Sequence, residues 1–499
     1  MTRRVPPDCS LRKHASQALA ILFPFRRLHL PPQMSRLHSR TSSSSRSIWH
    51  ELPEDTFRQH LVDLERRTNA VPIEPQIFPL HNHGRASTRE LPLHVEQRLA
   101  DDLAFLAAVE EGAQSVAAVC LEQHVQPAGL TVRFAALDLS ISNEVKDALH
   151  RIASSLTSFS HETDSSMQIE ALFEQIVDLH FRRLLARLRS NKWEKPKFLS
   201  KQHKKPLWQD FTNLTHRVQF LYTKKEVASR RSVENQLQSL GPYFEAFEAT
   251  EGGSQSELTS LKGLIKASYQ FCTVQDVAEF VRRLEASVGT YGPTAKVASA
   301  IKCLRQIEKV AAYWRIAASL GVTSRTYPSL FQTDLRLTFL TPYESVPTAI
   351  GYEAWATTCH VHAEIQLAVY YDLLFQPSDR PGTEGISNGR PEQEFHRPRA
   401  IGTSKWLCYL CYLFLRFHGH FVPANTHGRL YDQWTIPDLA EYGDQVCIRY
   451  RSLVQAIDKE VMKEANSFQS SGVEDSSIVR WRAEPMTSRQ NLFDADSIA

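Results

Sequence analysis

Two short segments that lie far apart in the sequence constrain this chain more than any other feature. The first contains His362 and Glu364, and the second contains Cys408 and Cys411. One imidazole and two thiols are a ligand set for a tetrahedral zinc site that keeps one position open, and a nearby carboxylate that does not bind the metal can move protons. A fold that uses this chemistry must bring both segments together, so we interpret the rest of the chain as the scaffold around them.

Cysteine usage favours a metal site over a disulfide framework. The chain has 8 cysteines in 499 residues, and only Cys408 and Cys411 lie close together in the sequence. Sparse cysteines with one C-x-x-C pair indicate a reducing compartment and a bound metal. On a helix the two thiols share one face, and in the first turn the helix dipole favours their thiolates. Taken singly, His362 also fits a hydrogen-bonded core histidine, and the two cysteines fit apolar core positions.

Composition sets limits on partners and location. A net charge of +3 gives no overall signal for binding a polyanion. The longest apolar run, 406–415, is about half of the ~20 residues that a membrane-spanning helix needs. We therefore expect a soluble intracellular protein, cytoplasmic or nuclear, without membrane contact. Residues 1–50 form a basic, Ser-rich tail, which fits a disordered tail, a mitochondrial targeting segment, or a start codon placed before the true one at Met34.

Hydrophobic periodicity divides the remainder into two regions. Residues 51–292 repeat apolar positions at steps of three and four, which predicts an all-helical region of unknown function. Residues 293–485 alternate helices and strands, which predicts a three-layer α/β/α domain with a central sheet, and 486–499 form a tail. The expected helices are 296–320, ended by Gly321, then 362–375, one from about 406, and 439–465. The expected strands are 335–340, 345–350, 399–403, 421–422 and 477–481.

A basic segment in the helical region is a weak indication of nucleic acid. Residues 182–205 contain ten basic side chains and one acid, Glu194, with Trp193 and Phe198 between them. Such a mixture can follow a phosphate backbone and stack bases. It fits a solvated helix end with inward-packed aromatics better.

Segments 362–364, 404–411 and 426–434 together resemble one branch of the cytidine deaminase-like superfamily. This branch is expanded in fungi and also occurs in bacterial effector or toxin-type proteins. The resemblance covers about residues 295–485. It implies that His362, Cys408 and Cys411 bind Zn²⁺ and that Glu364 shuttles a proton during hydrolytic deamination of a base.

The sequence departs from the wider superfamily motif at one position and leaves two histidines to be placed. Leu407 stands where the superfamily has Pro directly before the first Cys. His360 competes with His362 as a ligand by residue type, and we prefer His362 because it directly precedes Ala-Glu. His427 has three open roles, namely substrate contact, support of the metal site, or part of a capped turn.

Two functions remain open, in addition to a purely helical scaffold in which the cysteine spacing is accidental. The first is a zinc-dependent deaminase for a base of a nucleoside, nucleotide or nucleic acid. The alternative is a non-catalytic zinc-binding interaction protein with a degenerate deaminase fold. Glu364 favours the first, because a structural zinc site has no use for a proton shuttle. Protein partners, if any, are not indicated by the sequence.

Overall fold

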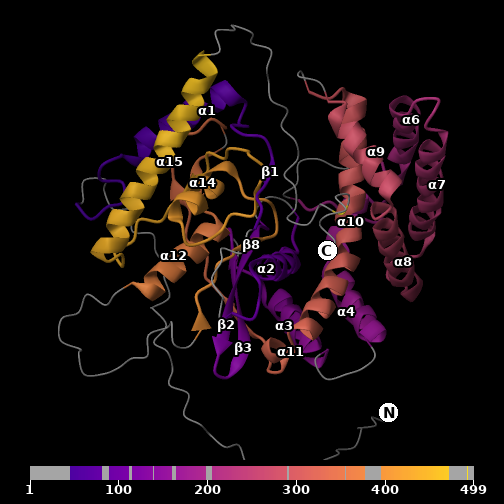
Figure 1. The fold of residues 1–499 in the computed structure, drawn as a ribbon, viewed down its shortest axis with the longest axis horizontal. Coiled ribbons are helices and arrows are strands. Elements are labelled where there is room, and N and C mark those ends of the chain that lie inside the picture. Colours follow the sequence, from indigo (N-terminus) through magenta and orange to yellow (C-terminus); the bar gives the residue numbers. More distant parts are fainter. Residues whose placement is uncertain are drawn as a thin grey trace, which may run out of the picture. The chain divides into compact units, whose positions relative to one another are not determined.

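The computed structural model describes residues 45–80, 89–111, 115–138, 140–159, 165–197, 205–288, 292–354, 356–376, 395–470 and 492 (Figure 1). The helices of this part are α1 (Glu54–Thr68), α2 (Leu93–Ala107), α3 (Asn143–Ser158), α4 (Ser165–Leu179), α5 (Phe181–Leu188), the 3-10 helix η1 (Leu207–Asp210), α6 (Phe211–Leu221), α7 (Val227–Ala249), α8 (Gln255–Cys272), α9 (Gln275–Ala286), α10 (Ala295–Thr326), α11 (Pro328–Phe331), α12 (Ala363–Phe375), α14 (Tyr409–His418) and α15 (Asp444–Ser470). Its strands are β1 (Gln76–Ile77), β2 (Ala117–Val125), β3 (Ala128–Ala136), β4 (Arg336–Phe339), β5 (Val346–Pro347), β6 (Thr358–Val361), β7 (Phe395–His396), β8 (Gly402–Thr403), β9 (Asn425–Thr426) and β10 (Trp434–Thr435).

The strands form three small sheets rather than one central sheet. The largest has the order β4-β3-β2, and both β7 and β8 pair with β2 on its other edge. A second sheet has the order β10-β6-β5, and a third joins β1 to β9. Strand β6, which leads into the His362 segment, therefore lies outside the largest sheet. The described residues form the expected mixed α/β structure, but these three small sheets do not confirm the single central sheet that the sequence predicts.

The β2–β3 hairpin is buried on both faces because helices cover each of them. Alternate side chains of a strand point to opposite faces. Val119 and Leu121 belong to the hydrophobic core that includes α2, whereas Glu122 on the opposite face accepts a hydrogen bond from Tyr371 of α12 at 2.9 Å. Helix α12, which follows the His362 segment, is thus packed directly on the hairpin.

The helices from α3 to α10 lie in sequence between two adjacent strands, β3 and β4. These strands pair in parallel, with Phe134 opposite Phe339. Apolar side chains of α2, β2, β3 and the helices up to α10 share one continuous core, and α10 packs on α2 as well as on α4, α5 and α8 (Figure 1). Residues 35–499 form one compact unit. The core of the helices before residue 292 continues into α10, and the domain boundary expected at this position stays a prediction.

Several expected elements are confirmed and others are wrong. Strand β4 and helix α12 lie where the pattern predicts them. The all-helical prediction for 51–292 is wrong at the β2–β3 hairpin, whose nearly continuous apolar runs do not alternate because both faces are buried. Helix α10 continues through Gly321 to Thr326, because a helix glycine is a cost that packing can outweigh.

The C-terminal predictions have a mixed outcome. A strand occurs at 425–426 instead of 421–422, and the last helix begins at Asp444 rather than near 439. The strand expected at 477–481 lies outside the described residues. Leu492, in the expected tail, is buried, and its amide donates to Glu308 at 2.9 Å. In the described part of the chain no helix has the length and apolar character needed to cross a membrane.

Candidate metal centre

The structure brings His362, Cys408 and Cys411 together. The Nδ1 atom of His362 lies 3.3 Å from Sγ of Cys411 and 3.7 Å from Sγ of Cys408. All three potential ligand atoms lie within 4.8 Å of one another. One nitrogen and two sulfurs at this separation can hold a metal ion, with room for a fourth ligand.

Both segments reach the centre at the N-terminal end of a helix. His362 is the residue that precedes α12, after β6 has ended at Val361. Cys408 occupies the same position before α14, where its sulfur accepts a hydrogen bond from the amide of Cys411 at 3.4 Å. Helix N-termini favour negative charge, so this geometry stabilises a thiolate. Cys408 is thus the N-cap residue of α14, and Cys411 lies in its first turn, whereas the sequence predicts a helix that begins near Trp406.

The three side chains perturb each other's protonation. Burial raises the pKa of Cys408, but the hydrogen bond with Cys411 and the charge of His362 outweigh it and bring the pKa to about 6. Burial lowers the pKa of His362, but Cys408 raises it to about 9. Burial and the neighbouring Cys408 hold the pKa of Cys411 well above its usual range. A divalent cation at this point would favour the thiolate of both cysteines.

Glu364 lies beside the cluster with one carboxylate oxygen unpartnered. Its side chain is buried, and Oε1 lies 3.9 Å from Nδ1 of His362. Within the described part of the chain, Oε2 has no hydrogen-bond partner. A buried carboxylate oxygen without a partner is costly unless it has a role. The donor set and this oxygen together fit a zinc ion with a proton-transferring group next to it.

Trp434 contributes a contact to the centre that the sequence analysis missed. Its indole Nε1 donates a hydrogen bond to Sγ of Cys411 at 3.1 Å. Strand β10 brings it there by pairing in parallel with β6, with Trp434 opposite His360. Donors to a metal-bound sulfur stabilise its negative charge. Trp434 lies in the 426–434 segment that carries part of the resemblance, but spacing in the sequence alone does not show that its ring contacts a cysteine.

His360 lies outside the cluster and pairs with another residue. Its Nδ1 lies 2.6 Å from a carboxylate oxygen of Asp138, at the end of the β2–β3 hairpin. Its Nε2 lies 3.2 Å from the hydroxyl of Thr358. The structure thus agrees with the preference for His362 over His360 as the metal ligand.

The 426–428 segment holds the Cys408 segment in place. The amide of His427 and the hydroxyl of Thr426 both donate to the carbonyl of Leu407, at 3.0 and 2.9 Å. Gly428 has a φ of +68°, and a Cβ there would lie 1.9 Å from the carbonyl oxygen of Ile73. Only glycine fits this position.

His427 itself is a neutral, buried side chain. Its Nδ1 accepts a hydrogen bond from the amide of Arg429 at 3.1 Å. Burial, followed by the charges of Arg429 and Lys405, lowers the pKa of His427 to about 3. Of the three roles left open by the sequence, these contacts favour a turn that supports the metal site.

Polar side chains of α2 fix the strand that leads to Cys408. Glu96 is fully buried and accepts hydrogen bonds from Arg399, including one from its amide at 2.8 Å. Asp101 accepts from the amide of Thr403 at 2.8 Å. The hydroxyl of Ser404 accepts from the amide of Ala117 in β2 at 3.1 Å. The N-terminal half of the chain is therefore part of the framework of the metal centre.

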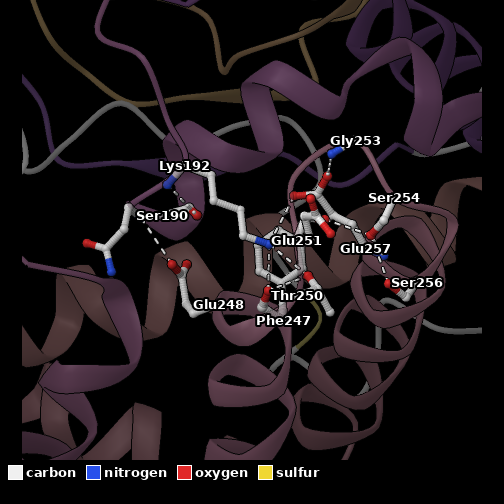
Figure 2. A network of polar contacts seen from close by, with 11 residues as sticks. Ser190, Lys192, Phe247, Glu248, Thr250, Glu251, Gly253, Ser254, Ser256 and Glu257 are labelled. Atoms are coloured by element: carbon white, nitrogen blue, oxygen red, sulfur yellow. Dashed lines mark hydrogen bonds and ion pairs between the residues drawn. The ribbon is translucent and has the colours of Figure 1, made fainter.

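Three of the ten basic side chains in the 182–205 segment form ion pairs in the helical part. Lys192 contacts the carboxylate of Glu257 at 3.0 Å and the carbonyl of Phe247 at 2.7 Å (Figure 2). Arg189 and Lys205 both pair with Asp210. The expectation of a solvated charged stretch is wrong at Lys192 and Arg189, whose side chains are largely buried in ion pairs, whereas the side chain of Lys205 is half exposed.

Comparison with known proteins gives one result for part of the chain. The region that holds the metal centre is deaminase-like. Residues 361–438 match a family model described as an OTT_1508-like deaminase. This range contains Glu364, the three clustered side chains and Trp434. Neither the curated proteins nor the solved structures contain a significant match to the chain.

Proposed function

We propose that the protein is a zinc-dependent hydrolytic deaminase that acts on a base of a nucleoside, nucleotide or nucleic acid. The observation that carries this proposal is the unpartnered Oε2 of Glu364 beside the cluster of His362, Cys408 and Cys411. The similarity of residues 361–438 to deaminases supports the same reaction class. A metal site that served only structure would not require the buried carboxylate.

The residues have distinct roles in this reaction. His362, Cys408 and Cys411 would hold the zinc ion, which, when bound, lowers the pKa of water and so supplies a nucleophile near neutral pH. Glu364 accepts the first proton of the attacking water at its free Oε2 and delivers it to the ring nitrogen; it then transfers the second proton, from the hydroxyl formed on the ring carbon, to the departing amine. Water replaces the exocyclic amine by a carbonyl oxygen, and ammonia is released. Trp434 holds the sulfur of Cys411 through its indole N–H.

The metal assignment is tested by the zinc content of the purified protein. We expect one zinc per chain in the wild type and a large loss in the double variant Cys408→Ser, Cys411→Ser. Cys447→Ser is the matched control, because this buried cysteine donates to the carbonyl of Arg46 at 3.0 Å, away from the cluster. Equal zinc in the wild type and the double variant would refute the site.

The catalytic assignment is tested by ammonia release from a panel of nucleosides, nucleotides and single-stranded oligonucleotides. Glu364→Gln should lower the rate by at least about 100-fold while zinc stays bound, as expected for loss of general acid-base catalysis. Glu344→Gln, which changes an exposed carboxylate between β4 and β5, is the control and should retain full activity. Zinc binding without ammonia release from any substrate would favour the non-catalytic interaction protein.

The finer expectations from the sequence are part of this proposal. We propose a cytidine deaminase-like three-layer arrangement around the centre, supported by α2 and α12 packing on the β2–β3 hairpin. We also propose that the protein belongs to the branch that is expanded in fungi, which the resemblance of segments 362–364, 404–411 and 426–434 supports. The sparse cysteines support an intracellular location.

A further inference from the structure

Three cationic side chains from distant parts of the sequence lie close enough to act on one another electrostatically. Arg183 and Arg187 lie one turn apart on α5, and both are buried, with 7% and 8% of their surface exposed. Lys405 lies in the segment between β8 and α14, three residues before Cys408. Burial lowers the pKa of Lys405 to about 7, and the charges of Arg183, Lys309 and Arg187 act in the same direction.

The two arginines are not neutralised by an ion pair within the described residues. Nη1 of Arg183 is buried and has no hydrogen-bond partner there. Nη1 of Arg187 donates to the carbonyl of Lys309 at 2.9 Å, which carries no net charge. Glu110 and Glu111 act on Arg183 from a distance, and Oε1 of Glu111 is engaged by the indole of Trp193.

Buried arginines elsewhere in the same structure do have carboxylate partners. Arg133 lies 2.8 Å from Glu122, and Arg305 lies 2.9 Å from Glu308. Burial of a charge without a partner costs much more than burial of a paired one. The contrast shows that Arg183 and Arg187 lack the compensation that the fold gives to its other buried arginines.

Aromatic faces offer only partial compensation. The guanidinium of Arg187 lies 5.1 Å from the ring centre of Phe105 and 5.4 Å from that of Tyr313. Arg183 lies 5.8 Å from Phe105. Such contacts attract a cation weakly compared with a carboxylate or phosphate. They position the guanidinium groups without using their hydrogen-bond donors.

A chain of ring contacts connects this cluster to the metal centre. Lys405 and Arg429 both act on His427, whose ring lies 5.8 Å from that of Tyr431. The ring of Tyr431 in turn lies 6.5 Å from that of His362. Lys405 is therefore linked to His362 through His427 and Tyr431, and it lies in the chain segment that carries Cys408.

We propose that Arg183, Arg187 and Lys405 bind a phosphoryl group of the substrate, so that the substrate is a nucleotide or a nucleic acid rather than a free nucleoside. Guanidinium groups match phosphate oxygens in charge and in hydrogen-bond geometry. The inference rests on the proposed deaminase function for the identity of the substrate. It also gives the α3–α10 region a function, since α5 supplies two of the three cations.

The first experiment measures binding of inorganic phosphate to the full-length, zinc-loaded protein by calorimetry in chloride buffer. Wild type should bind phosphate, and Arg183→Met, Arg187→Met and Lys405→Met should each weaken binding about 10-fold or more, as loss of a charge-assisted hydrogen bond implies. Arg182→Met, an exposed neighbour on α5, is the control and should bind as wild type does. No binding by the wild type, or equal binding in all variants, would overturn the proposal.

Thermal unfolding separates ligand binding from a purely structural role. Phosphate should raise the melting temperature of the wild type and of Arg182→Met, but not that of Arg183→Met. Without phosphate, Arg183→Met should melt no lower than the wild type, because the substitution removes a buried charge that lacks a partner. If Arg183→Met melts lower by the same amount with and without phosphate, the arginine is structural and the proposal fails.

A kinetic comparison identifies the source of the phosphoryl group. Arg183→Met should raise KM for phosphorylated substrates and leave free nucleosides unchanged. Stimulation by a 5′-monophosphate points to a nucleotide, and stimulation only by a short oligonucleotide points to nucleic acid. Phosphate binding without any ammonia release would refute the deaminase function and leave the phosphate site intact. Equal deamination of nucleosides and nucleotides, without phosphate binding, would refute the phosphate site and leave the deaminase function intact.

Discussion

The hydrogen bond from Trp434 to Cys411 gives the most discriminating prediction for the metal centre. In Trp434→Phe the aromatic ring remains, but the donor that lies 3.1 Å from Sγ of Cys411 is lost. A hydrogen bond to a charged group contributes about 1.5 to 3 kcal/mol. At 1.4 kcal/mol for each factor of ten, zinc should bind about 10 to 100 times more weakly. This range agrees with the usual effect of groups that orient metal ligands.

The assay is competition for zinc against a chelator of known affinity at constant pH. Trp49→Phe is the matched control, because it makes the same chemical change in the same aromatic cluster. Trp49 is buried and packs 5.7 Å from Phe57, which lies 6.2 Å from Trp434. Its zinc affinity should equal that of the wild type. An affinity of Trp434→Phe within twofold of the wild type, or an equal loss in Trp49→Phe, would contradict the role of the indole N–H.

Two further predictions concern the framework of the centre. Gly428→Ala should lower the free energy of unfolding by several kcal/mol and should also lower the zinc content. The left-handed backbone alone costs about 1 to 2 kcal/mol for a residue other than glycine, and a Cβ would meet the carbonyl oxygen of Ile73. Chemical denaturation and a zinc assay of the purified variant check this. Asp372→Asn should cost about 3 to 5 kcal/mol, because Asp372 is the shared partner of buried Arg397 and His418. Although burial raises the pKa of Asp372, His418 and the arginines hold it well below its usual range. Its contribution should therefore be full above about pH 4 and lost as pH falls further, a loss that Asp372→Asn should not show in acid denaturation.

The clustered residues were predictable because their chemistry is encoded locally. A C-x-x-C pair and a His-Ala-Glu triplet at helix starts specify ligand types and faces before any tertiary contact forms. Strand β4 was predictable because its apolar residues alternate, and α12 because it is a long, mostly apolar run without Gly or Pro. The choice of His362 over His360 needed tertiary contacts, because both are histidines two residues apart and only Asp138 shows where His360 is engaged.

The β2–β3 hairpin could not be recognised from periodicity. Its residues are buried on both faces, so the strands lack the alternation that marks a half-exposed strand. Glu96 and Asp101 follow the usual pattern of a solvated helix face, yet both are buried by the 399–403 segment, which is about three hundred positions away in the sequence. Such long-range contacts leave no local signal.

By itself, the sequence determined which side chains could hold a metal, the carboxylate beside them and the helices that present them. These depend on residue type and on spacing within a few positions. Only the tertiary structure decided that side chains of α2 hold the 399–403 segment, that Trp434 donates to Cys411, and that Arg183 and Arg187 lie near Lys405. The physical reason is that burial and charge compensation depend on which distant side chains pack together, and the chain order does not specify these contacts.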